Sequence, residues 1–229
     1  MIIRGLQKTT LLDYPGCVAA TVFLGGCNFR CPFCHNMNLV LGEDAAEYRS
    51  EEVFDFLKKR KGILDGVCVT GGEPTLYSDI NPFIKQIKEM GYKVKLDTNG
   101  TKPEVIEELL YNNLLDYIAM DIKGSADKYK DCCGVNDCDM SKIKESIGII
   151  MDSGIDYEFR TTLVKELHDE QTFTKGCELI KGAKKYYLQP FVDSDYVPNH
   201  EFTAPEVDTL KKYREIAAGY IDEVILRGV

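Results

Sequence analysis

The stretch CNFRCPFCH, residues 27–35, places three cysteines at the spacing C-x3-C-x2-C: Cys27, Cys31 and Cys34. Thiolates are soft ligands that bind iron–sulfur clusters, zinc or copper. Three of them cannot complete a structural zinc site, which takes four ligands, and they leave one iron of a four-iron cluster without a protein ligand. Three reduced loop cysteines are the alternative, but ordinary loops do not gather thiols at ligand spacing. The spacing therefore predicts a metal centre with an open position for a substrate or cofactor.

On both sides of this stretch, short apolar runs alternate with longer amphipathic ones. This alternation predicts βαβ units and a parallel sheet. Pro82 and Pro103 fit first helical turns, and Gly91 and Gly154 fit helix ends. The expected strands are 17–24, 66–70, 93–97, 116–121, 156–163 and 184–190, with a final strand-like run at 224–226. The expected helices are 50–61, 78–90, 102–114, 140–153, 168–181 and 204–217.

Polar or glycine-rich residues follow each expected strand at its end, where parallel α/β folds build their active sites. Six units predict an open barrel, and a doubly wound sheet is the alternative. One conflict arises, because Lys95 and Asp97 share one face of a strand. Lys95 must either line a wet cleft or be moved by a register shift before Asp97. The segments at the strand ends are 25–27, 70–74, 97–100, 121–124, Glu158 with Arg160, and 189–190.

Composition narrows the class of protein. The chain has 229 residues, which fits a single domain over 1–229, with 28 Lys and Arg against 37 Asp and Glu. A net charge of −9 argues against a general binder of nucleic acids or anionic membranes. Nine cysteines, no signal-like start and no apolar run near 20 residues favour a cytoplasmic protein whose thiols carry metal chemistry.

The cysteine motif, with the aromatic Phe33 before Cys34, resembles the radical S-adenosylmethionine (radical SAM) superfamily. The resemblance implies a partial (β/α)6 barrel and a [4Fe-4S] cluster. Cys27, Cys31 and Cys34 would hold three irons as metal ligands and catalytic residues. The fourth iron would bind the amino and carboxylate groups of S-adenosylmethionine.

Further motifs match the cofactor-binding residues of that family. Gly71, Gly72, Glu73 and Pro74 form its GGEP motif, which contacts the cofactor's amino group. The resemblance places Phe33 at the cluster and the segment from His35 against the adenine. It places Arg160 near the ribose or carboxylate and Gln189 at the position of a ribose contact. Gln189 departs from pyruvate formate-lyase activases, which carry a histidine close to this site.

The remaining cofactor-binding candidates are Asp97, Thr98, Asn99, Asp121 and Lys123, which would surround the methionine carboxylate and ribose. In some relatives the equivalents of Asp97, Thr98 and Asp121 also hold a monovalent cation. Taken alone, the Asp97 segment could be a turn that caps a helix, and Asp121 with Lys123 an ordinary ion pair.

Two longer stretches narrow the resemblance to glycyl radical enzyme activases. GLQKTTLLDYPG (residues 5–16) and YYLQPF (186–191) resemble the activating proteins of anaerobic ribonucleoside-triphosphate reductase. The resemblance implies an enzyme that cleaves S-adenosylmethionine reductively. The resulting 5′-deoxyadenosyl radical would take a hydrogen atom from a glycine of that reductase. Flavodoxin or ferredoxin would supply the electron.

Three alternatives stay open from the sequence. The partner could be another glycyl radical enzyme, the substrate could be a small molecule, or the chain could be a non-enzymatic iron–sulfur electron carrier. Cys132, Cys133 and Cys138 could form a second metal site or, with Cys177, a redox relay. Their spacing lacks a C-x2-C pair, so we expect reduced loop cysteines there. Beyond Asp193 the sequence carries no recognisable motif.

Overall fold

The computed structural model describes residues 1–42 and 47–228. Its centre is one eight-stranded sheet whose strands follow in chain order. Strands β2 to β8 run parallel, and β1 pairs antiparallel with β2 at the edge. The strands are β1 (Ile3–Thr10), β2 (Ala19–Leu24), β3 (Gly66–Gly71), β4 (Lys93–Thr98), β5 (Tyr117–Asp121), β6 (Asp156–Leu163), β7 (Lys185–Pro190) and β8 (Glu223–Leu226).

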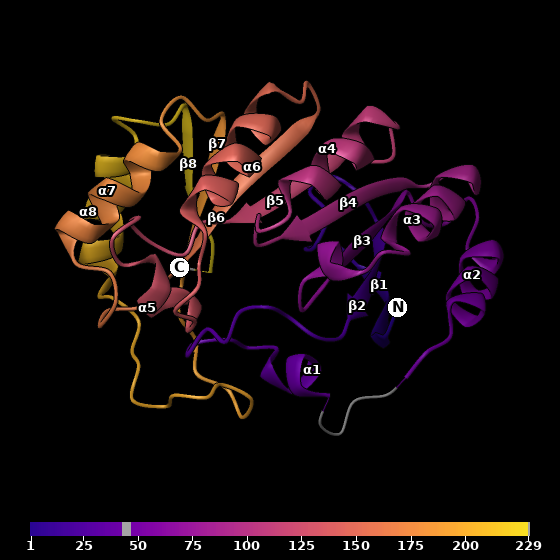
Figure 1. Cartoon of the computed structure of the whole chain (residues 1–229), viewed down its shortest axis with the longest axis horizontal. Helices are drawn as coiled ribbons and strands as arrows, with labels where there is room; N and C mark the ends of the chain where they lie inside the picture. The colour runs from indigo at the N-terminus through magenta and orange to yellow at the C-terminus, as the bar shows by residue number, and fades with distance from the viewer. Residues whose placement is uncertain (43–46, 229) are drawn as a thin grey trace.

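The sheet is open and partly curled, with its larger helices along the outer face (Figure 1). Within the described ranges β1 and β8 are the two sheet edges and do not pair with each other. This confirms the open barrel built on six βα units. The helices are α1 (Met37–Leu41), α2 (Ser50–Lys59), α3 (Ile80–Glu89), α4 (Pro103–Tyr111), α5 (Tyr129–Cys133), α6 (Met140–Asp152), α7 (Glu170–Leu179) and α8 (Val207–Ala217), with a 3-10 turn η1 at Pro74–Leu76.

All six expected strands and all six expected helices are present, with ends that move by at most a few residues. Pro103 is the first residue of α4 and Pro82 lies in the first turn of α3. Gly91 and Gly154, which follow helices, have φ angles of +92° and +77°, as helix ends require. The unexpected elements are β1 and the short helices α1 and α5, which are too short to carry a helical period.

The apolar core lies between the sheet and the helices. In β4, Val94 and Leu96 are fully buried in this layer, while Lys95 and Asp97 face the other side, the barrel lumen. Helix α3 covers the sheet with Ile80, Ile84 and Ile87 at helical spacing. Two faces of different chemistry thus arise from the alternation of side chains along each strand.

The carboxyl ends of the strands open onto the site. The segment 25–41, α5 and the segment after β7 lie on the same side of the molecule (Figure 1). Backbone hydrogen bonds join them: Arg30 N donates to Cys133 O at 2.8 Å, and Asn199 N donates to Pro32 O at 3.1 Å. Within the described ranges, no helix is long and apolar enough to span a membrane.

Candidate functional site

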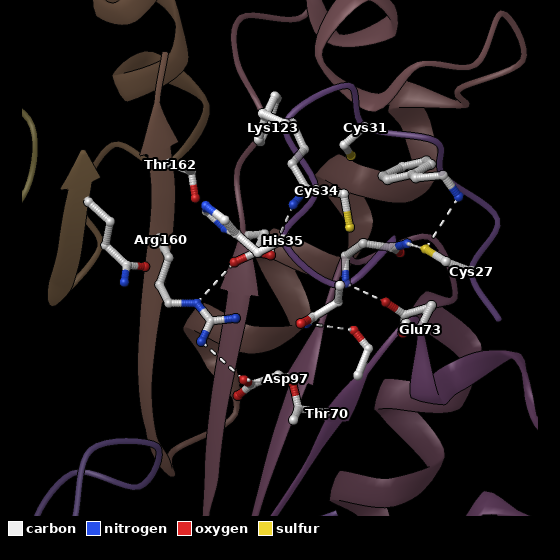
Figure 2. Close-up of a pocket in the computed structure, with 18 of the residues that line it drawn as sticks. Cys27, Cys31, Cys34, His35, Thr70, Glu73, Asp97, Lys123, Arg160 and Thr162 are labelled. Carbon is white, nitrogen blue, oxygen red and sulfur yellow. Dashed lines mark hydrogen bonds and ion pairs between the residues drawn. The ribbon is translucent and has the colours of Figure 1, made fainter. Parts of the chain in front are cut away.

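A cavity of about 480 Å³ lies at the carboxyl ends of the strands. Its size is typical of small-molecule sites. The thiols of Cys27, Cys31 and Cys34 line it from the loop that follows β2, as Figure 2 shows. Every predicted cofactor-binding residue except Pro74 also lines the cavity. Pro74 is buried and begins η1, so it shapes the turn and does not reach the cavity.

Close backbone packing fixes the cysteine loop. Gly72 N donates to Leu24 O at 2.8 Å, and Glu73 N donates to Gly26 O at 2.9 Å. A Cβ on Gly72 would lie 1.7 Å from Gly26 O, and one on Gly134 would lie 2.0 Å from Arg30 O. Only glycine allows these approaches, so the Gly71-Gly72 turn and the end of α5 hold the loop from two sides.

The three thiols are largely removed from water and lie near a positively charged side chain. Burial raises the pKa of Cys27 to about 11 and that of Cys31 to about 12, while the Lys123 ammonium works against this rise. Phe29 N donates to Cys27 Sγ at 3.3 Å, and Lys123 Nζ lies 5.9 Å from the centre of the Phe33 ring. A bound metal stabilises thiolates directly, so the thiols need a metal to ionise at neutral pH.

The donor set fits an iron–sulfur cluster. Among the described residues, no three His, Cys, Asp or Glu side chains converge closely enough to hold one ion. Three thiols nonetheless face one cavity, with an ammonium group near them and neighbouring N–H donors directed at Cys27 Sγ. Soft ligands spread around a cavity suit a cluster of several irons, and hydrogen bonds to sulfur are a usual feature of such sites.

Glu73 is the most completely bonded residue of the predicted set. Its Oε1 accepts from Thr75 N at 3.1 Å, Thr75 Oγ1 at 2.5 Å and Thr98 Oγ1 at 2.8 Å. Its Oε2 accepts from Asn99 N at 2.6 Å. The side chain is fully buried, and burial raises the pKa of this carboxyl group despite its donors. Glu73 therefore joins the end of β3 to the end of β4 from below the cavity surface.

Charged side chains form a chain across the lumen (Figure 2). Asp97 Oδ2 accepts from Arg160 Nη1 and from Thr70 Oγ1, each at 3.1 Å. Asp121 Oδ1 accepts from Arg160 Nε at 2.9 Å, and Asp121 Oδ2 accepts from Lys123 Nζ at 3.0 Å. Burial favours the neutral acid, but Arg160 and Lys123 outweigh it and hold the pKa of Asp121 below its usual range. Both carboxylates are thus ionised at neutral pH.

The sequence left two explanations for Lys95 on the face of Asp97, a wet cleft or a register shift, and the structure shows neither. The register of β4 with β3 and β5 is continuous, so no shift occurs before Asp97. Lys95 is 1% exposed and therefore lines no wet cleft. Its ammonium donates to Asp97 Oδ1 inside the lumen. A buried cation is tolerated there because a carboxylate pairs with it.

The far end of the cavity comes from strands β6 and β7 and from the segment after β8. Gln189 lies there with Thr162 and Arg227. Arg227 stacks on the Tyr187 ring at 3.9 Å, and its Nη1 lies 3.5 Å from Glu158 Oε1. His35 Nε2 bonds Val192 O, and its ring stacks on Phe191 at 5.7 Å. The segment after β7 therefore closes over the cysteine loop.

Asn36, Thr70 and Pro190 lie in segments that the sequence placed at the site, although they were not named as candidates. The lining residues that sequence reasoning missed are Asp13, Phe23, Phe29, Val40, Thr162, Val192, Arg227 and Gly228. Strand parity could have found two of them. Thr162 follows Arg160 by two residues and shares the lumen face of β6. Ile225 of β8 is level with Arg160 through Tyr187, and Arg227, just past the end of β8, continues the same alternation. Val192 reaches the cavity through a loop, which leaves no periodic signal.

Comparisons with known proteins agree with this geometry. The family model "Radical SAM superfamily" matches residues 21–173. A protein of Methanocaldococcus jannaschii, provisionally named glycyl-radical enzyme activating enzyme, is 36% identical over 100% of this chain and 96% of its own length. The pyruvate formate-lyase-activating enzyme of Clostridium pasteurianum is 31% identical over 82% of this chain and 81% of its own length.

Solved structures share the fold. Streptococcus suis SuiB bound to S-adenosylmethionine superimposes with a TM-score of 0.69 at 15% identity, over 91% of this chain and 52% of that one. The chain belongs to the radical SAM superfamily. Within it, the chain belongs to the glycyl-radical enzyme activating enzymes, and its cofactors are the [4Fe-4S] cluster and S-adenosylmethionine of that family.

Proposed function

We propose that this activase generates the glycyl radical of an anaerobic ribonucleoside-triphosphate reductase. The observation that carries the proposal is the cavity, in which three cluster-type thiols face the Asp97–Arg160–Asp121–Lys123 charge chain. The stretch at residues 5–16 supports the choice of partner through its resemblance to reductase activases. Flavodoxin or ferredoxin is the proposed electron donor.

When bound, the reduced cluster supplies one electron that splits S-adenosylmethionine into methionine and a 5′-deoxyadenosyl radical. Cys27, Cys31 and Cys34 hold the cluster in this proposal. Lys123 and Arg160 present cationic donors to the methionine carboxylate or ribose, each already oriented by Asp121. Gln189 and the segment from His35 take the ribose and adenine end.

The Gly71-Gly72 turn and Glu73 have different roles in binding the amino group of S-adenosylmethionine. The two glycines are partly exposed and line the cavity, so their backbone lies within reach of a bound amine. The Glu73 carboxylate is buried and bonds Thr75, Thr98 and Asn99. We therefore assign it to fixing the turn and the Asn99 segment. The segment after β7 excludes water by packing Phe191 and Val192 against His35.

The test is an electron paramagnetic resonance assay with the reconstituted, reduced protein, S-adenosylmethionine and the reductase from the same organism. A glycyl radical signal on the reductase is the expected result. Pyruvate formate-lyase is the second candidate partner, because its activating enzyme is 31% identical to this chain. A signal on the lyase and none on the reductase would transfer the proposal to that partner.

A further inference from the structure

Lys95 is a fully enclosed ammonium at the Asp97 end of the charge chain. Its side chain is 2% exposed. It bonds Asp97 Oδ1, lies 3.8 Å from Cys68 Sγ and sits 5.9 Å from the centre of the Tyr117 ring. Continuous strand register fixes its Cα between β3 and β5. The ammonium is thus a permanent part of the lumen, unlike a surface lysine that could swing away.

The groups that could hold a monovalent cation in this cavity are already bonded. Both oxygens of Asp97 have cationic partners, Lys95 and Arg160. Both oxygens of Asp121 are likewise bonded, to Arg160 and Lys123. The Thr98 hydroxyl donates to Glu73 and accepts from Gly100 N. A metal cation at these carboxylate oxygens would lie beside an ammonium or guanidinium group, so the expected donor set does not fit it.

The charge balance points the same way. Three cationic side chains, Lys95, Arg160 and Lys123, face two carboxylates, so the chain of charges carries one positive charge in excess. A metal cation would add to that excess among largely buried side chains, where charges interact more strongly than in bulk water. A ligand carboxylate bound at Lys123 and Arg160 would offset this excess locally, with any positive groups of the ligand held elsewhere in the cavity.

We propose that the Lys95 ammonium acts as a built-in monovalent counter-ion, so that this activase binds S-adenosylmethionine without sodium or potassium. Lys95 is a positioning residue in this role. It balances Asp97, which leaves Arg160 between both carboxylates and directed toward the cavity. The inference rests on the proposed binding of S-adenosylmethionine in this cavity.

The first test measures the dissociation constant of S-adenosylmethionine for the cluster-reconstituted protein by anaerobic calorimetry. Buffers contain potassium, sodium or tetramethylammonium chloride at equal ionic strength, because tetramethylammonium is too large for a small cation site. We expect constants within twofold of one another. Binding at least tenfold weaker in tetramethylammonium would overturn the inference alone. No binding in any buffer would overturn the proposed function, and the inference with it.

The second test compares Lys95→Met with Lys93→Met. Lys93 lies on the same strand but is exposed, so its replacement controls for the loss of a charge on β4. We expect Lys95→Met to bind S-adenosylmethionine at least tenfold more weakly in tetramethylammonium and to regain most of the affinity in potassium or sodium. The control should match the unchanged protein. Uniform weakening in all three buffers would assign Lys95 a purely structural role, and undiminished binding would overturn the inference too.

If Lys95→Met does not fold, Lys95→Met with Asp97→Asn removes both charges of the pair. The inference then expects this double variant to fold and to show no difference between the three buffers. A sodium or potassium requirement that persists without Asp97 would contradict it, because the cation could not be replacing Lys95 opposite that carboxylate.

Discussion

At the scale of single residues, the three lining thiols have unequal surroundings but one expected role. Cys31 is the most deeply buried of the three and lines the cavity. We expect Cys31→Ala to lose the cluster, measured as iron falling from about four per chain after anaerobic reconstitution. Cys177→Ala is the matched control, because Cys177 is fully buried in α7, outside the cavity. A full iron content in Cys31→Ala would contradict the ligand assignment.

A substitution at Glu73 tests whether this buried carboxylate stabilises the fold around the cavity. Glu73→Gln keeps the shape but directs amide hydrogens at groups that now donate to the carboxylate, Thr75 N or Asn99 N. We expect a loss of about 2 kcal/mol in the free energy of unfolding, as for a buried donor left without its partner. Urea unfolding measures it, with Glu108→Gln on the exposed face of α4 as the control. A loss no larger than the control's would show that the four hydrogen bonds contribute little.

Residue chemistry decided what the sequence could and could not predict at the site. The cysteines and the polar residues at strand ends were recognisable because their types are rare in those positions. The partners of Lys95 were not, since strand parity alone placed a cation in the lumen without showing that Asp97 two residues on would pair with it. Arg227 follows the same parity rule, but no motif drew attention to it.

At the scale of elements, α5 supports the cysteine loop through its backbone, and we expect it to supply no cluster ligand. The Cys133 carbonyl accepts from Arg30 N, while the Cys133 thiol lies near the carbonyls of Lys130 and Val135, at 3.7 and 3.8 Å. We expect a Cys132→Ala, Cys133→Ala, Cys138→Ala variant to keep its full iron content, because the Arg30 bond uses backbone atoms. The iron assay after reconstitution checks this, and loss of about half the iron would instead reveal a second cluster.

The elements themselves were predictable where they repeat. The sequence of each βα unit shows an apolar run for the strand and a helical spacing of apolar residues for the helix. In α3 these residues are Ile80, Ile84 and Ile87. Strand β1 was not predicted, because it pairs only at the edge and its residues from Arg4 to Thr9 are all at least partly exposed. The short helices α1 and α5 span five residues each, which is too few for periodicity to emerge.

At the scale of the whole molecule, the open sheet explains why a charged lumen is possible. A closed barrel fills its interior with layers of apolar side chains. Here β1 and β8 do not pair within the described ranges, and the cavity draws residues from β2 through to β7 and from the segment after β8. Water and ligands can therefore reach Asp97, Arg160 and Asp121, which a packed barrel would exclude.

That openness predicts a substrate preference. A short peptide that copies the glycine region of the reductase should be a poor but real substrate, because a glycine Cα has no side chain to obstruct its approach to the cavity. Deuterium on that Cα should appear in 5′-deoxyadenosine, as measured by mass spectrometry. The same peptide with alanine in place of the glycine should give none, since its methyl group obstructs the approach. Deuterium on the Cα of a neighbouring residue is the control and should stay in the peptide. If neither peptide nor reductase passes deuterium to the nucleoside while a small metabolite does, the enzyme acts on that small molecule and the proposed activation of the reductase fails.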